Sequence, residues 1–195
     1  MNDHYFTKNP TSEFGTKEII VNIFGAEYNF ITGRGVFAFD KFDRGTELLI
    51  KSISGKGKFL DLGCGYGAVG IIIANSFGKV VQIDINERAI ILAKRNAKLN
   101  RRKNCKAIQS DGFEAVKDQK FDVIATNPPN HAGKKLIISW IAQVKDYLEK
   151  DGEFYFVCKT KLGAKSYESE ILEKFGNCDT VKKGSGYRVY RAVNS

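Results

Sequence analysis

The amino-acid sequence predicts an α/β fold with a mainly parallel sheet and helices on both of its faces. From Lys58 to the C-terminus, short strand-like apolar segments alternate with longer segments whose apolar residues recur at helical spacing. Such alternation is typical of strand–helix–strand units, which build parallel sheets. The chain has 195 residues, 43% of them hydrophobic and 27% charged, which suits one globular domain with a sizeable core.

The segment before this alternation predicts a β-hairpin and a loop. Two strand-like stretches flank Gly25-Ala26, and a stretch punctuated by glycines follows them. Thr46 is expected to cap a helix that runs to about Ile53. We therefore expect a single domain, 1–195. Its hairpin and loop occupy 1–45 and its core 46–195, with strand-like stretches at 18–24 (EIIVNIF) and 27–32 (EYNFIT) and the loop at 33–45.

The alternating region has helix ends that are marked by polar residues and glycines. Asn86 is expected to cap one helix, and Gly152 and Gly176 are expected to end two later ones. Apolar residues from Leu136 to Leu148 recur at helical spacing and are assigned to one helix face. The predicted strands are 58–62, 79–84, 106–109, 121–125, 153–158, 177–182 and 187–193, and the predicted helices are 68–77, 87–99, 134–149 and 164–175.

The net charge of +9 allows two interpretations. It is either a solvated basic surface or the binding surface for a polyanion such as nucleic acid. The basic residues gather in loops, which favours the polyanion. The clusters are Lys98, Arg101, Arg102, Lys103 and Lys106; Lys134 and Lys135; Lys159, Lys161 and Lys165; and Lys182, Lys183, Arg188 and Arg191.

Cysteine usage and hydropathy favour a cytoplasmic protein. The four cysteines form no CxxC pair and have no histidine at metal-ligand spacing, so we expect reduced thiols and no metal site. The longest apolar run, 68–74, is far too short to span a membrane, and the first residues do not resemble a signal segment. We therefore expect a cytoplasmic location and no membrane partner.

A glycine-rich stretch, LDLGCGYGAVG at 60–70, lies between a predicted strand and a predicted helix. Gly63, Gly65 and Gly67 permit a close approach of the backbone to a ligand. The spacing also satisfies the dinucleotide pattern, and Asp84 stands where a ribose-binding acid is wanted. On these grounds alone, a nicotinamide enzyme is one interpretation.

Three further features favour a different ligand. Asp61 places a carboxylate beside the glycines, where a pyrophosphate would be repelled and a cation attracted. Asp111 ends the third strand of the alternating region, and the next strand ends on Asn127-Pro128-Pro129. Acids without a phosphate-binding Lys-Ser/Thr pair suit a ribose-containing cation, and S-adenosylmethionine is such a ligand. The alternative is that the glycines serve turns and the aspartates cap helices.

The motifs together resemble those of a known enzyme group. The stretches LDLGCGYGAVG, IDIN at 83–86, SDGF at 110–113 and TNPP at 126–129 are similar to successive motifs of class I S-adenosylmethionine-dependent methyltransferases. Within that group the chain resembles the methyltransferase small domain family, which includes guanine-N2 methyltransferases of small-subunit ribosomal RNA. The stretches that carry this likeness are HYF at 4–6, GVFAFDKFDRGTELLI at 35–50, NPPNHAGK at 127–134, KTKLGAKS at 159–166 and GYRV at 186–189.

The resemblance implies a Rossmann-like fold with a seven-stranded, mostly parallel sheet whose last strand is antiparallel. It also implies an S-adenosylmethionine site. The implied contacts are Gly63, Gly65 and Gly67 with the methionine part; Asp61 with its ammonium group; Asp84 with the ribose; Asp111 and the adjoining Gly112 with the adenine edge; Phe113 or Ile85 with the adenine ring; and Thr46, with the loop before it, as a cover over the cofactor.

The Asn-Pro-Pro motif suggests how an exocyclic amine of a base becomes a nucleophile. Two acceptors, Asn127 Oδ1 and the Pro128 carbonyl, would hold the N–H bonds and direct the nitrogen lone pair at the methyl group. Pro128 and Pro129 have restricted backbones, which would keep the acceptors in place. The alternative role of this motif is a turn that ends the strand.

Asn130 departs from the family pattern, because many relatives carry an aromatic or bulky apolar residue there. Another aromatic would then stack on the target base, with Phe6, Phe37 and Phe39 as candidates. Further substrate contacts are expected from His131, Lys134, Arg101, Arg102 and Lys103.

The preferred function is therefore guanine-N2 methylation of ribosomal or transfer RNA. Glutamine-N5 methylation of protein and adenine-N6 methylation of DNA use the same acceptors and stay open, as does a non-catalytic, cofactor-binding RNA module. The chain is too short for a second full domain. We expect a monomer or a homodimer, and a partner protein or the second copy would supply additional RNA contacts.

Overall fold

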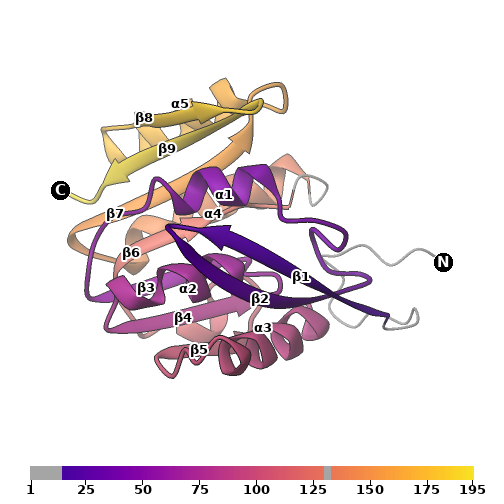
Figure 1. Cartoon of the computed structure of the whole chain (residues 1–195). Coiled ribbons are helices and arrows are strands. Elements are labelled where there is room, and N and C mark those ends of the chain that lie inside the picture. The colour runs from indigo at the N-terminus through magenta and orange to yellow at the C-terminus, as the bar shows by residue number, and fades with distance from the viewer. Residues whose placement is uncertain (1–14, 130–132) are drawn as a thin grey trace.

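A seven-stranded sheet forms the centre of the molecule in the computed structural model, which describes residues 15–129 and 133–195. The strand order is β5-β4-β3-β6-β7-β9-β8 (Figure 1). Among the described residues, β9 is antiparallel to both neighbours and the other pairs are parallel, as predicted. The strands are β3 Lys58–Leu62, β4 Lys79–Asp84, β5 Cys105–Gln109, β6 Phe121–Thr126, β7 Leu148–Lys159, β8 Asp179–Gly184 and β9 Tyr187–Val193.

Helices cover both faces of this sheet, which confirms the predicted layers. Successive strand residues alternate between two cores; Phe59 packs into the core with α1 and α2, and Leu60 packs into the core with α4 and α5. The α-helices are α1 Arg44–Ile50, α2 Ala68–Ile73, α3 Glu87–Leu99, α4 Lys134–Val144 and α5 Ala164–Phe175, and the 3-10 turns are η1 Ala74–Ser76, η2 Glu114–Val116 and η3 Lys145–Tyr147.

The predicted hairpin is a separate two-stranded sheet, β1 Thr16–Ile23 and β2 Ala26–Gly33. Its outer strand β2 lies on α3, where two asparagine side chains replace a neighbouring strand. Asn96 Oδ1 accepts from Ile31 N at 2.8 Å, and Asn96 Nδ2 donates to Ile31 O at 2.9 Å. Asn100 makes the same pair of bonds with Asn29. These bonds satisfy backbone groups that an unpaired strand edge would leave exposed.

The helix predicted for 134–149 is the main error in the sequence-based assignment. α4 ends at Val144, and β7 begins at Leu148, which pairs with Phe121. Gly152 is therefore a strand residue at an irregularity of the β6–β7 pairing, not a helix end. A Cβ on Gly152 would lie 2.9 Å from Glu149 O and 3.1 Å from Phe121 O, so the crowded carbonyls require glycine here.

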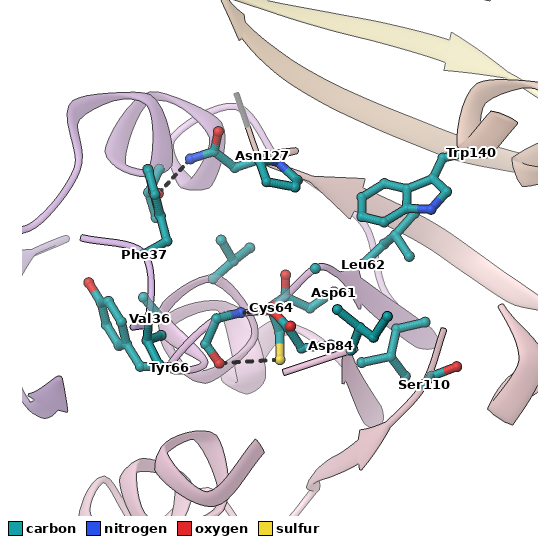
Figure 2. A pocket seen from close by; sticks show the side chains of 18 of the residues that line it. Val36, Phe37, Asp61, Leu62, Cys64, Tyr66, Asp84, Ser110, Asn127 and Trp140 are labelled. Atoms are coloured by element: carbon teal, nitrogen blue, oxygen red, sulfur yellow. Dashed lines mark hydrogen bonds between the residues drawn. The ribbon is translucent and has the colours of Figure 1, made fainter. Parts of the chain in front are cut away.

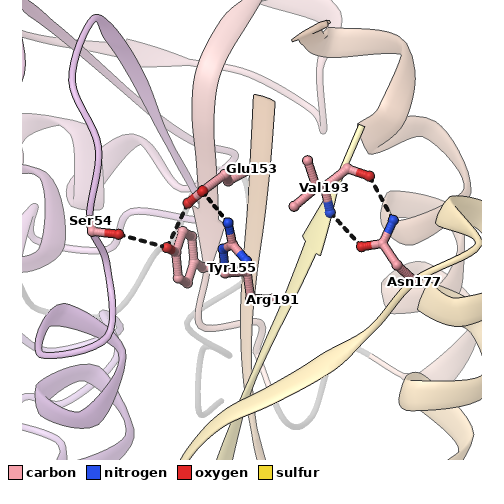
Figure 3. A network of polar contacts seen from close by, with 6 residues as sticks. All are labelled: Ser54, Glu153, Tyr155, Asn177, Arg191 and Val193. Atoms are coloured by element: carbon pink, nitrogen blue, oxygen red, sulfur yellow. Dashed lines mark hydrogen bonds and ion pairs between the residues drawn. The ribbon is translucent and has the colours of Figure 1, made fainter. Parts of the chain in front are cut away.

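Polar side chains join β7, β9, the segment after α1 and the segment before β8 (Figure 3). They lie toward the amino edge of the sheet, away from the carboxyl ends of the parallel strands. Glu153 pairs with Arg191, and Tyr155 donates to Glu153 at 2.6 Å and contacts Ser54 at 3.2 Å. Asn177 bonds both backbone groups of Val193. Within the described residues, no helix is long and apolar enough to cross a membrane.

Candidate active site

A pocket lies at the carboxyl ends of β3, β4, β5 and β6, where parallel sheets place their ligands (Figure 2). It holds about 1020 Å³ of empty space, including solvent at its mouth. The described residues that line it include three carboxylates and no Lys, Arg or His. The sequence-predicted residues that line it are Thr46, Asp61, Gly63, Gly65, Asp84, Ile85, Asp111, Gly112, Asn127 and Pro129.

The glycine loop forms the floor of this pocket. Gly63 N donates to Ile83 O at 2.9 Å, and Gly65 N donates to Asp84 Oδ2 at 2.9 Å. Gly63 has φ +73 and Gly65 has φ +55, which disfavour a side chain. Gly67 has another role than the sequence suggested. It does not line the pocket, and a Cβ there would come within about 3 Å of Gln82 and Ala93, so this glycine packs the start of α2 against β4 and α3.

Asp61 is 2% exposed, and no described cationic side chain pairs with it. Its Oδ2 accepts from Gly70 N at 3.0 Å and from Gln82 Nε2 at 3.3 Å. Burial outweighs these hydrogen bonds and raises the pKa of Asp61 to about 7. Any cation that enters the pocket would stabilise the ionised form of this buried carboxylate.

Asp84 ends β4, and backbone donors hold both of its oxygens. Oδ2 accepts from Gly65 N, and Oδ1 accepts from Asn86 N at 2.9 Å. Burial raises the pKa of Asp84 to about 6 despite these bonds. Asn86 caps α3 as predicted, and its Nδ2 donates to Gly35 O at 2.7 Å, which ties the loop before α1 to the end of β4.

The third strand end contributes Asp111 and Gly112, but not the ring of Phe113. Phe113 is 2% exposed and stacks on Tyr147 with ring centroids 4.2 Å apart, so its ring lies in the core rather than in the pocket. Of the two residues expected at an adenine ring, Ile85 alone lines the pocket. Asp111 is exposed at the rim.

Two residues of α4, Leu136 and Trp140, complete the wall and were not identified from the sequence. Trp140 lies against the glycine loop, since a Cβ on Gly63 would be 3.3 Å from its ring. Their i, i+4 spacing assigned them to an apolar helix face, and that pattern does not distinguish a core contact from a pocket wall.

The side-chain amide of Asn127 is held in one orientation. Its Nδ2 donates to Asp43 Oδ2 at 3.0 Å and to Thr46 Oγ1 at 2.9 Å, and Thr46 Oγ1 lies 3.2 Å from Asp43 Oδ2. Both N–H bonds are therefore used, and Oδ1 accepts no hydrogen bond from any described residue. A flipped amide would point its oxygen at the Asp43 carboxylate.

Asp43 is the centre of this arrangement and was also missed. It, rather than Thr46, caps α1, because its Oδ2 accepts from Thr46 N at 2.7 Å. Its Oδ1 accepts from the Tyr187 hydroxyl at 3.1 Å. A Cβ on Gly45 would lie 2.6 Å from the Tyr187 ring, so glycine is needed for this approach. We call Asp43, Thr46 and Asn127 the amide clamp.

The remaining motif and aromatic candidates are divided by the structure. Pro128 is buried and does not line the pocket, whereas Pro129 does. Phe37 lines the pocket and Phe39 does not. The expectations for Phe6, Asn130 and His131 concern residues outside those that the structure describes.

The basic candidates lie in two places. Lys134 is the exposed first residue of α4, close to Leu136 and the pocket. Arg101, Arg102 and Lys103 precede β5 (Figure 1) and so lie at the amino edge of the sheet, whereas the pocket lies at the carboxyl edge. Arg102 also makes hydrogen bonds within the fold: it donates to Ile71 O, Asn75 Oδ1 and the Tyr28 hydroxyl. The structure therefore does not bring these three residues to the pocket, and their contact with the substrate stays a prediction.

Known proteins are similar to this chain in sequence and in fold. Residues 27–191 match the model of the methyltransferase small domain. YbxB, an uncharacterized protein of Bacillus subtilis (strain 168), is 34% identical, and the alignment covers 98% of each chain. Ribosomal RNA small subunit methyltransferase C of Actinobacillus succinogenes is 34% identical over 80% of this chain and 48% of its own length.

A solved structure extends the likeness to three dimensions. The 16S rRNA N2 methyltransferase of T. thermophilus, in complex with AdoMet and guanosine, superposes with a TM-score of 0.84 at 29% identity, over 95% of this chain and 52% of that chain. The chain thus spans about half the length of the two ribosomal RNA methyltransferases. With the family model matching most of its residues, the protein belongs to the methyltransferase small domain family.

Proposed function

We propose that this protein methylates an exocyclic amine of RNA, with guanine N2 of ribosomal RNA as the preferred target. As a member of its family, it is an S-adenosylmethionine-dependent methyltransferase. The observation that carries the proposal is the amide clamp, which presents Asn127 Oδ1 beside a pocket whose described charged lining is entirely carboxylate.

The pocket fits S-adenosylmethionine better than a phosphate-bearing dinucleotide. The cofactor has an ammonium group, a sulfonium and ribose hydroxyls, and it supplies a transferable methyl group on a positively charged sulfur. Asp61 would hold the ammonium group, and Asp84 would accept from the ribose hydroxyls. Ile85 and Asp111 would contact the adenine. A pyrophosphate would instead meet buried acids, without a basic side chain among the described lining residues.

Asn127 is suited to activating a weak nucleophile. The lone pair of an exocyclic amine is delocalised into its ring, and two acceptors on its N–H bonds favour a tetrahedral nitrogen. Asn127 Oδ1 would be one acceptor, and the carbonyl of Pro128, whose residue does not line the described pocket but lies between two that do, is proposed as the other. Water would take the proton that the nitrogen loses. Rate enhancement would then come from placement and electrostatics.

RNA is the preferred substrate class for two reasons. Two relatives are ribosomal RNA methyltransferases at 34% and 29% identity, and one of them was solved with guanosine. The net charge of +9 also suits a polyanion. A second copy of the chain or a partner protein is the proposed source of further RNA contacts.

A transfer assay with tritiated S-adenosylmethionine tests this proposal. The protein is incubated separately with unmodified small-subunit ribosomal RNA, transfer RNA, DNA and a release factor, and labelled nucleosides are identified by mass spectrometry. We expect N2-methylguanosine in RNA and a much slower, still measurable transfer by Asn127→Ala, which should still bind S-adenosylhomocysteine. Label found only in protein or only in DNA would overturn the substrate proposal.

A further inference from the structure

Basic side chains are concentrated at the carboxyl edge of the last three strands of the sheet. We define the basic rim as Lys159, Lys161, Lys165, Lys183 and Arg188. It comprises the end of β7, the segment that leads into α5, the first turn of α5, and the ends of β8 and β9 that meet their turn (Figure 1). These strand ends lie at the same edge of the sheet as the carboxyl end of β6. Residues 154–167 and 180–195 contain no acid at all.

The amino edge of the same strands has the opposite character. Glu149, Asp151 and Glu153 lie in the first half of β7, and Asp179 begins β8. Charge is thus separated along the strands, with the positive end beside the Asn-Pro-Pro segment. A basic surface that served solubility alone would not require this separation.

No described acid forms an ion pair with a residue of the basic rim, although Glu168 lies near Arg188, since both interact with the Tyr190 hydroxyl. The ion pairs among the described residues are Lys17–Asp40, Lys51–Glu47, Lys174–Asp146 and Arg191–Glu153, and none includes a rim residue. Lys183 and Arg188 even stand directly opposite each other in the β8–β9 ladder. Like charges at such positions destabilise a sheet, so this pair costs stability unless an anion lies against it.

Protection of a sheet edge explains only part of the rim. Lysines on an edge strand discourage pairing with other chains, and β8 is such a strand. That argument accounts for Lys183. It does not account for Lys159, Lys161 and Lys165, which belong to an interior strand, the segment that follows it and the first turn of α5.

The rim is continuous with the amide clamp. Thr126 pairs with Phe156, which places Asn127 at the level of Val157. Lys159 is two residues farther along the neighbouring strand, about 7 Å beyond that level and about 5 Å to the side. The rim therefore begins about 9 Å from the level of Asn127, and β9 and β8 extend it by about 5 Å each.

We propose that the basic rim binds the sugar-phosphate backbone of the RNA strand that flanks the target base. This inference rests on the proposed RNA substrate and adds the path of the strand, from Asn127 across β7 and β9 to β8. The contacts are electrostatic and independent of sequence, so they position the RNA without selecting it.

Two matched triple variants test this path. The rim variant carries Lys159→Gln, Lys161→Gln and Lys165→Gln. The control carries Lys98→Gln, Lys103→Gln and Lys106→Gln at the amino edge. Each set removes three positive charges from exposed side chains. The affinity for a fluorescein-labelled single-stranded RNA of about 20 nucleotides is measured by anisotropy between about 50 and 300 mM salt.

The rim variant should lose about two units of the slope of log affinity against log salt, and about 50-fold in affinity near 0.15 M salt, if all three lysines contact phosphates. The control should change both quantities far less. In the methylation assay the rim variant should show a raised KM for RNA at an unchanged kcat. Its binding of S-adenosylhomocysteine, followed by the fluorescence of Trp140, should match that of the unmodified protein.

The outcomes separate this inference from the proposed function. Equal losses in both variants, or a larger loss in the control, overturn the rim while leaving RNA methylation intact. If the unmodified protein binds no RNA and methylates only protein or DNA, both proposals fail. A kcat defect without a change in RNA affinity also contradicts a backbone-binding role.

Discussion

The amide clamp predicts that Asp43 controls catalysis through Asn127 without being one of the residues that line the pocket. The bond from Asn127 Nδ2 to the Asp43 carboxylate is charge-assisted, and such bonds contribute about 1.5–3 kcal/mol. In Asp43→Ala this contribution is lost, and the transition state must impose the amide orientation itself. We therefore expect kcat to fall about 10- to 150-fold.

Asp43→Asn separates the clamp from the helix cap. Asparagine caps helices as well as aspartate does and still offers a neutral acceptor. Its kcat should fall only about 3- to 10-fold, because a neutral bond is roughly half as strong. Both variants are assayed well below their unfolding temperatures, since Asp43→Ala also loses about 0.5–2 kcal/mol of cap stabilisation.

A double-mutant cycle measured by single-turnover methyl transfer tests the reasoning. If Asp43 acts through Asn127, then Asp43→Ala should have almost no further effect on the rate in an Asn127→Ala background. Affinity for S-adenosylhomocysteine should not change in either single variant. A rate for Asp43→Ala within twofold of the unmodified protein, or full additivity with Asn127→Ala, would refute the clamp.

Three other predictions concern the pocket and the fold. Gly63→Ala should weaken S-adenosylhomocysteine binding measured by calorimetry, because φ is +73 and the new Cβ would lie 3.3 Å from Trp140, whereas Gly176→Ala, with φ +78 and open space, should cost only stability. Burial raises the pKa of Asp61 to about 7, so the protonated side chain contributes stability to the unliganded fold below pH 3.8. This contribution is lost as the pH rises through about 7. Asp61→Asn should therefore make the unfolding temperature depend less on pH, and an unchanged pH dependence would contradict the reasoning. Glu153→Gln, which loses its ion pair with Arg191 at the amino edge, should lower the free energy of unfolding by about 1–3 kcal/mol and leave kcat unchanged; an altered kcat would show that this edge affects the site.

Much of the fold follows from local sequence signals. The strands of the sheet alternate between two cores, and Asn86 and Gly176 mark helix ends in the structure as they do in the sequence. The boundary before β7 does not follow, because Tyr147 and Leu148 continue the apolar spacing of α4 into a different element. Gly152 looks like a helix end, yet it is required by carbonyl oxygens from β6, which no local pattern reveals.

The site divides in the same way. Residues at strand ends, such as Asp61 and Asp84, were found because each is one of the last two residues of its own strand. Asp43 was missed because its partner Asn127 is 84 residues away and Tyr187 is 144 residues away. The hydrogen bonds of Arg102 within the fold were not foreseen, because a basic loop that anchors the fold and one that binds a ligand have the same composition.

The position of β9 between β7 and β8 also affects the order of events during synthesis. Tyr187, which fixes Asp43, opens β9, and in the described sheet β8 has no neighbour until β9 has been made. A nascent chain that still lacks β9 would therefore have a cofactor pocket but would lack the Tyr187 bond that holds Asp43 beside the catalytic amide. Full methylation competence would begin only after β9 has paired with β7.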